Sequence, residues 1–265
     1  MVEPLHNWIL AASLAAIVVA VAYRLRSLSA GGAVAAVLIG TIIVGTGGWW
    51  PGVILVVFFA TSSLLSRSES AQARGSRRDW VQVLANGWGM LLGCVLFTFT
   101  GWEPWLLFGI GAIAAATADT WSSEIGRFSD SPPRLITNGM VVSPGTSGAI
   151  TLLGTMASIA GAALIAMLTT LAVSIDSLPS ELSVFIVFIG ITLAGISGGM
   201  LDSLLGATVQ EKRWCDTCET VTEANPHICG TTTRHIGGIA GVTNDVVNML
   251  CVLTGALIGV VSGIL

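Results

Sequence analysis

The chain has 265 residues, of which 53% are hydrophobic and only 10% are charged, and its formal net charge is −4. A soluble globular domain carries about 25% charged residues, so this composition excludes an ordinary soluble protein. It predicts an all-α polytopic membrane protein that forms a single helical bundle over residues 1–265. No nucleic-acid partner is expected.

Eight apolar runs are long enough to be read as membrane spans. They cover residues 5–23, 31–47, 50–66, 81–100, 104–118, 148–173, 183–205 and 238–264, and the second and fifth are short. The first run is expected to remain in the protein rather than to be a cleaved leader. Glu3 and His6 precede it, and its basic residues, Arg24 and Arg26, follow it.

The basic residues give an orientation. With eight spans, the segments 24–30, 67–80, 119–147 and 207–237 fall on one side, and together they hold all eleven Lys and Arg residues. Because cytoplasmic loops are enriched in these residues, we predict an integral cell-membrane protein with both termini outside. The long loops 67–80, 119–147 and 207–237 would then be cytosolic. A miscounted span would scatter the basic residues over both sides.

Two spans end in similar polar segments on the predicted cytosolic edge. Span five runs into Asp119, and span seven runs into GISGGMLDSLLGATVQ, which places Asp202 at an equivalent depth. Each is followed by a loop and a glycine-rich segment that leads into the next span. We therefore predict a parallel repeat of two helical hairpins, spans five and six and spans seven and eight. The alternative is that small residues and Asp recur by chance in a chain rich in Gly and Ala.

Carboxylates at one depth suggest a site for Mg²⁺, which prefers hard oxygen ligands and phosphate oxygens. The predicted ligands are Asp119, Glu124 and Asp202, with Asp245 close by. Glu124 is five residues beyond Asp119, so it shares the face of Asp119 only if the helix unwinds there. The same reasoning places Ser123 one turn after Asp119 and Gln210 two turns after Asp202.

The segments VVSPGTSG and HIGGIAGVTN are predicted to open helices that run away from the cytosol. Free N–H groups at such helix starts bind phosphate. Gly145 and Thr146 are therefore candidate phosphate-binding residues, with Asn244, Asp245 and Asn248 as polar neighbours. A Pro-Gly-Thr sequence is also ordinary chemistry for a helix start.

The loop SRSESAQARGSRRDW is rich in arginine. One reading is an anchor that touches the headgroups of anionic membrane lipids. The other is that Arg74, Arg77 and Arg78 bind the phosphate groups of a substrate. Asn86, one turn inside the fourth span, should face the bundle, either as a ligand contact or as a hydrogen bond between helices.

The last loop contains WCDTCETVTEANPHICG, in which Cys215, Cys218, His227 and Cys229 form a C-x2-C-x8-H-x-C pattern. Four such ligands suit a small tetrahedral structural zinc site. The alternatives are unmetallated thiols or a redox pair, and the redox pair lacks a thioredoxin-like context. Cys94 and Cys251 lie in apolar spans and are read as core residues.

Several of these motifs together resemble one family. ADTWSSEIG, VVSPGTSG, MLDSLLGATVQ, the cysteine loop with HICG, TNDVVN and RRDWVQVLANG are similar to segments of multi-pass membrane proteins that include the plant phytyl-phosphate kinase and animal transmembrane protein 19. The resemblance covers the chain from about Gly31 to its end. Most members of that family have no assigned activity.

The resemblance implies phosphorylation of an isoprenoid monophosphate, phytyl or prenyl, to its diphosphate with a nucleoside triphosphate such as CTP. By the same resemblance Asp119, Glu124 and Asp202 would bind Mg²⁺ and nucleotide, and the 144–148 turn with Thr146 would cradle phosphates. The D-x-x-S/A-x-x-G spacing is also similar to that of CTP-using dolichol kinases and phosphatidate cytidylyltransferases. No Walker A or protein-kinase glycine loop is present.

Three other functions are compatible with the sequence. A transporter of a phosphorylated solute would favour inverted repeats and polar groups at the membrane midplane. A scaffold or lipid-binding protein would not need Asp119 or Asp202. Cytidylyl transfer from CTP to a lipid phosphate would release pyrophosphate instead of a nucleoside diphosphate.

Overall fold

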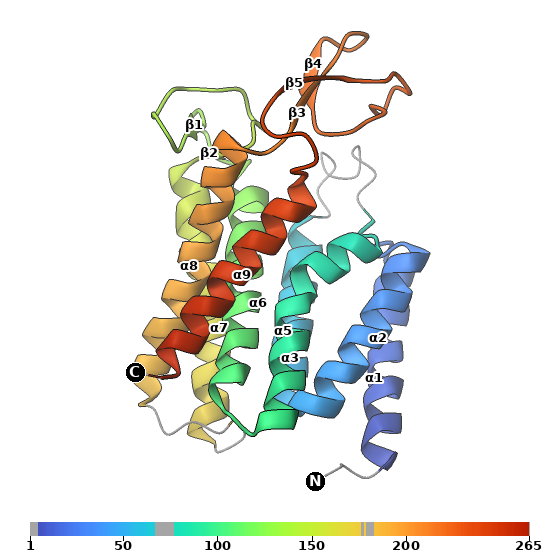
Figure 1. Cartoon of the computed structure of the whole chain (residues 1–265), viewed down its shortest axis with the longest axis vertical. Coiled ribbons are helices and arrows are strands. Elements are labelled where there is room, and N and C mark those ends of the chain that lie inside the picture. The colour runs from blue at the N-terminus through green and yellow to red at the C-terminus, as the bar shows by residue number, and fades with distance from the viewer. Residues whose placement is uncertain (1–4, 67–76, 176–177, 179–182, 265) are drawn as a thin grey trace.

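The structure is a computed structural model that describes residues 5–66, 77–175, 178 and 183–264. Within these residues eight helices form one bundle (Figure 1). They are α1 (Leu5–Arg24), α2 (Ala30–Gly47), α3 (Trp49–Leu65), α5 (Trp80–Thr100), α6 (Pro104–Gly126), α7 (Leu152–Ser174), α8 (Val184–Thr208) and α9 (Asn244–Ser262). The prediction of an all-α bundle with about eight apolar helices is confirmed.

The helices fall into two groups that lie side by side. Helices α1, α2, α3 and α5 make up the first group, and α6, α7, α8 and α9 make up the second (Figure 1). Helix α6 packs against all three other members of its group and also against α5 and α3. It is therefore the central helix, and its residues from Leu106 to Ala118 are all buried.

Five of the helices, α2, α5, α7, α8 and α9, are long and apolar enough to cross a membrane on their own. Helices α1 and α3 contain shorter apolar stretches. Helix α6 has 23 residues but carries Asp119 and Glu124 near its end. Since other helices surround it, α6 does not need a continuous apolar surface.

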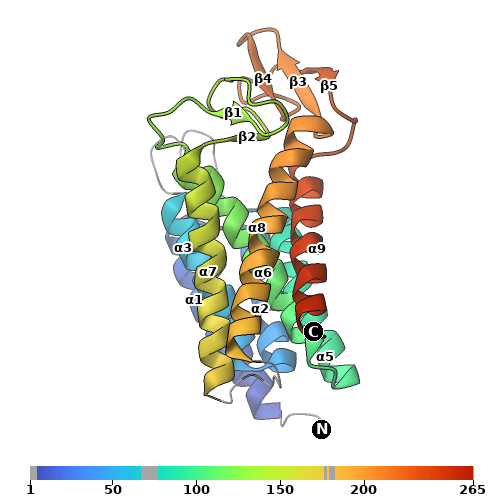
Figure 2. The same ribbon diagram turned by 90° about the vertical axis from the view of Figure 1, so that its left-hand side faces the viewer.

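The five short strands of the described residues lie at one end of the bundle, and the start of α1 and the end of α9 lie toward the other (Figures 1 and 2). Strands β1 (Arg134–Leu135) and β2 (Ala149–Ile150) form an antiparallel pair. Strands β3 (Lys212–Cys215), β4 (Thr220–Thr222) and β5 (Arg234–Gly237) form a sheet in the order β4-β3-β5. We call the end that carries these strands the loop end.

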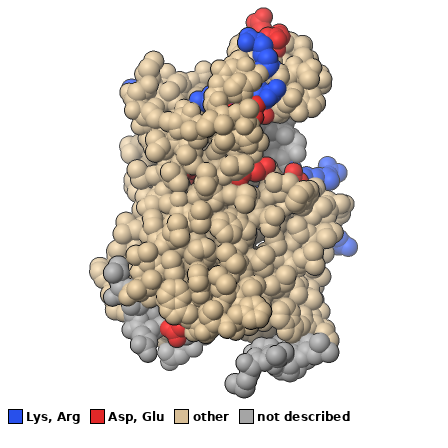
Figure 3. All heavy atoms as spheres, viewed as in Figure 1, with Lys and Arg blue, Asp and Glu red and all other residues tan. Residues whose placement is uncertain are grey.

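Charged residues are also concentrated toward the loop end. On the face shown in Figure 3, blue and red atoms gather at the loop end and just below it, while the flank of the bundle is almost free of them. An uncharged flank is what lipid contact requires. The assignment of the loop end to the cytosol stays a prediction, and the segment 67–76, with Arg67 and Arg74, lies outside the described residues.

Three helices begin or end at residues other than the limits of the predicted spans. Helix α6 does not end near residue 118 but continues to Gly126. Helix α7 begins at Leu152 and α9 at Asn244, several residues after the predicted starts at 148 and 238. The polar side chains after Asp119 made the apolar run end before the helix does. The glycine-rich segments before α7 and α9 form turns and strands and do not form the first helical turn.

Candidate functional site

Asp119 and Asp202 meet at the loop end of α6 and α8. The two helices run in the same direction. The carboxyl groups of Asp119 and Asp202 lie within hydrogen-bonding range of each other. One turn earlier, a Cβ on Gly198 would overlap the methyl group of Ala115. A Cβ on Gly199 would lie 3.5 Å from the backbone nitrogen of Asp119. Glycines therefore let the helices approach closely enough to pair the two acids.

This pair is partly enclosed. The Oδ1 atom of Asp202 is buried and has no hydrogen-bond partner among the described residues. A buried carboxylate oxygen without a partner is costly, and a second carboxyl group beside it adds repulsion. Cys251 of α9 is also near both acids, and Asn248 lies one turn closer to the loop end on the same helix face. The pair has the donor set and the unsatisfied oxygen that fit a divalent cation.

A third carboxylate, Glu223, was missed by the sequence analysis. It follows β4, and its Oε1 accepts hydrogen bonds from Gln210 Nε2 at 2.6 Å and from Ser147 Oγ at 2.7 Å. It is near enough to Asp202 to interact with it electrostatically. The predicted residue Gln210 is thus at the site, where it is buried and holds Glu223. No local sequence signal marks Glu223, because its position depends on how the cysteine loop folds.

Glu124 does not join the pair. The helix continues without unwinding through Gly126, so Glu124 faces α3. Its Oε1 accepts a hydrogen bond from Ser66 Oγ at 2.7 Å, and its Oε2 forms an ion pair with Arg127 Nη2 at 2.7 Å. The structure thus brings Asp119 and Asp202 together and engages Glu124 with Ser66 and Arg127, although Glu124 is still near enough to Asp119 to interact with it electrostatically. The three-carboxylate magnesium site stays a prediction.

The phosphate cradle predicted at 144–148 is not a helix start. Helix α7 is capped by Thr151, whose side chain accepts a hydrogen bond from the Gly154 N–H. Gly145 lies in an exposed turn with φ +85°, and Thr146 Oγ1 donates to Ser143 O at 2.7 Å. The segment does reach the site by another route, since Gly148 packs against Ala207 and Gly206 of α8.

The remaining predicted residues are spread around the site. Ser123 donates to its own helix backbone, at Asp119 O and Thr120 O. Asn86 donates to Gln82 O, and Gly89 one turn later meets α6 and α9, so Asn86 lies on the face turned toward them. Asn244 is exposed at the start of α9, and Asp245 interacts with Asp79 rather than with the pair.

Two cations flank this end of the bundle. The guanidinium of Arg78 lies over the rings of Phe58 and Phe59, at 5.8 and 5.6 Å, and interacts with Glu124. Burial lowers the pKa of Arg78 to about 10, so it stays charged at neutral pH. On the other side, Lys212 Nζ donates to Ala207 O at 3.2 Å, at the end of α8.

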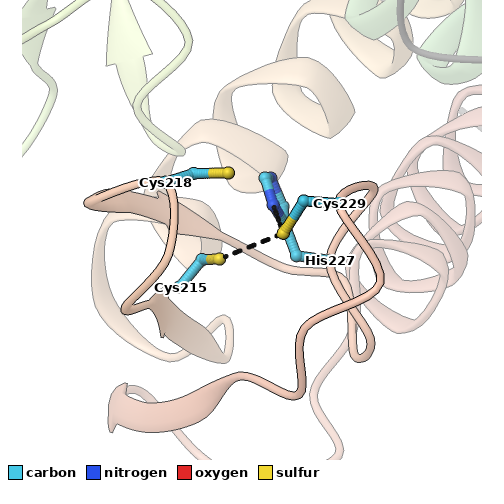
Figure 4. A group of neighbouring side chains, drawn as sticks. All are labelled: Cys215, Cys218, His227 and Cys229. Carbon is cyan, nitrogen blue, oxygen red and sulfur yellow. Dashed lines mark hydrogen bonds between the residues drawn. The ribbon is translucent and has the colours of Figure 1, made fainter.

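The four residues of the cysteine loop are brought together as predicted. The ligand atoms of Cys215, Cys218, His227 and Cys229 all lie within 4.8 Å of one another (Figure 4). Hydrogen bonds from Thr231 and His227 lower the pKa of the Cys229 thiol to about 5. All five cysteines are free thiols, so no disulfide links these residues.

Residues 13–256 match the family described as "Integral membrane protein DUF92". The chain belongs to this family. It is 32% identical to "Protein PGR" of Arabidopsis thaliana, over 95% of this chain and 94% of that protein. It is 34% identical to an uncharacterized membrane protein of Methanocaldococcus jannaschii, over 89% of this chain and 85% of that protein. A further uncharacterized membrane protein, from Synechocystis, is 30% identical over 66% of this chain and 69% of that protein.

No solved structure matches the chain. The chain is therefore an integral membrane protein of this family, and its candidate site must be judged by its own residues. A carboxylate pair near the loop end of two membrane helices, with a buried oxygen that has no hydrogen-bond partner among the described residues, is suited to binding a divalent cation.

Proposed function

We propose that the protein transfers a phosphoryl group from a nucleoside triphosphate to an isoprenoid monophosphate and produces the diphosphate. Mg²⁺ is the proposed cofactor, and CTP is the donor that the family resemblance favours. Phytyl or another prenyl phosphate is the proposed acceptor. The reaction would take place at the loop end, which we place in the cytosol.

One observation carries the proposal: Asp119 and Asp202 face each other beneath the loop end, and Asp202 Oδ1 has no hydrogen-bond partner among the described residues. Two ionised carboxylates at this position would repel each other, and either a shared proton or a bound cation relieves that repulsion. Mg²⁺ is bound in proteins through one or two carboxylates, waters and substrate phosphates. Bound there, it would neutralise charge on the phosphates of the donor.

The reaction needs little covalent chemistry from the protein. An oxygen of the lipid phosphate forms a bond to the γ-phosphorus, and the bond from that phosphorus to the β,γ-bridging oxygen breaks. The electron pair leaves with the nucleoside diphosphate. Positioning and electrostatic stabilisation are the main contributions of enzymes to such transfers. In this chain, Asp119 and Asp202 would hold the metal, and Lys212 and Arg78 would attract the phosphates.

The position of the pair also suits a lipid acceptor. Asp119 and Asp202 lie about two helical turns before the loop ends of α6 (Pro104–Gly126) and α8 (Val184–Thr208), and so nearer the loop end than the opposite end of each helix. A prenyl chain would remain beside apolar helix surfaces while its phosphate reached the loop end. A transporter would be expected to hold its polar site near the midplane, between inverted repeats.

The test is an assay with the purified full-length protein in detergent. Phytyl or geranylgeranyl monophosphate is mixed with Mg²⁺ and either CTP or ATP, and lipid and nucleotide products are measured by mass spectrometry. We expect lipid diphosphate and nucleoside diphosphate in equal amounts, with no product in EDTA. Asp119→Asn and Asp202→Asn should each remove most of the activity, whereas the exposed-loop control Asp130→Asn should retain it.

Each other outcome counts against the proposal. Pyrophosphate together with a cytidylylated lipid would replace it by cytidylyl transfer. Absence of product with both donors, from protein that unfolds cooperatively on heating, would refute phosphoryl transfer to these acceptors. Full activity of the Asp119→Asn variant would show that the carboxylate pair does not take part in the reaction.

A further inference from the structure

The cysteine loop, residues 211–237, is folded but has almost no core of its own. Among these residues only Cys215 and Thr233 are buried. Small folded segments without a hydrophobic core are stabilised by disulfides or metal ions. Since its cysteines are free thiols, this loop has no disulfide to hold it.

The ligand geometry fits a tetrahedral metal. Cys215 Sγ lies 3.6 Å from Cys229 Sγ, and His227 Nδ1 lies 3.2 Å from Cys229 Sγ (Figure 4). A tetrahedral zinc ion with Zn–S bonds of about 2.3 Å and a Zn–N bond of about 2.0 Å holds its ligand atoms about 3.5–3.8 Å apart. Three sulfurs and one imidazole nitrogen are a common zinc donor set.

The backbone presents these side chains from two tight turns. Cys215 ends β3, and Cys218 lies in the turn between β3 and β4. His227 and Cys229 lie in a second turn, which is closed by the hydrogen bond from Gly230 N to His227 O at 2.7 Å. The arrangement of two turns facing each other brings ligands from separate parts of the loop to one point.

The folded loop also fixes Glu223. This residue lies between the two turns, and its carboxylate bridges Ser147 and Gln210 beside Asp202. The contact joins three segments that are distant in the sequence: the turn before β2, the end of α8 and the cysteine loop. If the loop lost its fold, Glu223 would leave the site.

We propose that Cys215, Cys218, His227 and Cys229 bind one structural zinc ion, and that this ion holds Glu223 in place beside Asp202. Four protein ligands leave no open coordination position, so the zinc has no catalytic role. Glu223 is a positioning residue that ties the loop to the end of α8. The zinc site stands independently of the proposed phosphoryl transfer, because neither its ligands nor its test involves that reaction.

The first test measures metal in the purified full-length protein by mass spectrometry. We expect about one zinc per chain under reducing conditions. Cobalt substitution should give the thiolate charge-transfer bands and strong visible bands of a tetrahedral site. His227→Ala and Cys218→Ser should lose the zinc, whereas the control His235→Ala, on β5 of the same loop, should keep it.

Wild-type protein with no metal, or with iron in place of zinc, would overturn the assignment, as would a Cys215–Cys229 disulfide in protein kept reduced. These results do not depend on whether the variants fold. They also do not depend on any enzymatic activity, so a failure of the proposed function would leave them unaffected.

The second test measures amide hydrogen exchange before and after removal of zinc by a chelator. Exchange should rise in residues 211–237 and also in the 143–148 turn, because the contact from Glu223 to Ser147 is lost. Helices α1 and α2 should not change. Glu223→Ala, which removes the oxygen that accepts from Ser147 and Gln210, should keep its zinc yet raise exchange in the 143–148 turn. An unchanged turn after complete zinc removal would refute the link to Glu223.

Discussion

Helices α6 and α2 are both apolar, but they are buried to different extents. Of the 23 residues of α6, 14 are buried, whereas in the 18 residues of α2 only Gly32, Ile39 and Ile43 are buried. A polar group on a helix surrounded by protein avoids lipid, while one on a peripheral helix does not. The acids Asp119 and Asp202 are accordingly placed in the group formed by α6, α7, α8 and α9.

The two groups also differ in how their helices are joined. In the second group, backbones touch through glycines: Gly111 packs on Gly255, and Gly195 packs on Ala114. In the first group, the close approach of α2 to the segment before α5 is at the loop end, where Gly32 lies against Arg78 O and backbone hydrogen bonds join Ser27 and Ser29 to Arg78. Close packing of small residues fixes depth as well as distance. The glycine contacts of the second group therefore hold the side chains of Asp119 and Asp202 at the same depth.

The largest expected effect on activity comes from neutralising an acid of the second group, compared with an acid of the first group. If the proposed function holds, Asp119→Asn and Asp202→Asn should each lower kcat for diphosphate formation by roughly 100-fold or more, because each acid would contribute to one metal site. The double variant should lose little beyond either single one, since the two act as a unit. Asp79→Asn, in the first group, should retain activity because Asn also caps helices well. If the losses of the two single variants added up in the double variant, the two acids would act independently and not in one site.

The second effect concerns the glycine contacts. Gly198→Ala should destabilise the protein by about 1–3 kcal/mol, because its methyl group would overlap Ala115 and lie 2.8 Å from Cys251 O. In α2, a Cβ on Gly40 would meet Ala15 at an ordinary 3.5 Å. Gly40→Ala should therefore leave the melting temperature unchanged or raise it. Thermal unfolding in detergent measures both, and equal losses would contradict the difference between the groups.

The third effect lies at the junction of the groups. Glu124 joins α6 to the end of α3 through Ser66 and Arg127. Glu124→Gln should lower stability by about 1–2 kcal/mol, since it removes the charge opposite Arg127. It should keep kcat within a few-fold of wild type. A loss of kcat as large as that of Asp119→Asn would indicate that Glu124 acts in the metal site together with the two aspartates.

The sequence was sufficient for the class of fold and for the two aspartates. Apolar runs of spanning length indicate helices placed within a membrane. Asp119 and Asp202 follow similar runs of small residues, so their common depth could be predicted. The end of α6 was not, because polar side chains after Asp119 lower hydropathy without interrupting backbone hydrogen bonds. The contacts of Glu124 with Ser66 and Arg127 were not predicted for the same reason, since they depend on the helix continuing unbroken through Gly126.

The role of Glu223 could not be predicted from the sequence, for a different reason. Its contacts with Gln210 and Ser147 depend on the fold of the loop between β3 and β5 and not on any local periodicity. The cysteine spacing predicted that this loop would close on itself. It did not indicate which carboxylate the closed loop would carry to the end of α8.

The smallest effect separates two threonines close in sequence. Thr151 caps α7 through a hydrogen bond of 3.0 Å from Gly154 N, whereas Thr146 only donates to Ser143 O in a turn. Thr151→Ala should lower stability by about 1 kcal/mol, and Thr146→Ala by less than about 0.5 kcal/mol. Thermal unfolding of both variants measures this difference.

The same pair of variants tests the phosphate cradle. Because Thr146 lies before β2 and not at the start of α7, its hydroxyl is not part of a helix-terminal anion site. The KM for the nucleotide should therefore stay within a factor of about two in Thr146→Ala, as expected for a surface substitution. A rise of tenfold with unchanged stability would show that the turn binds phosphate through its own backbone and hydroxyl groups. The donor would then span from that turn to the aspartates, across the Ser147–Glu223 contact.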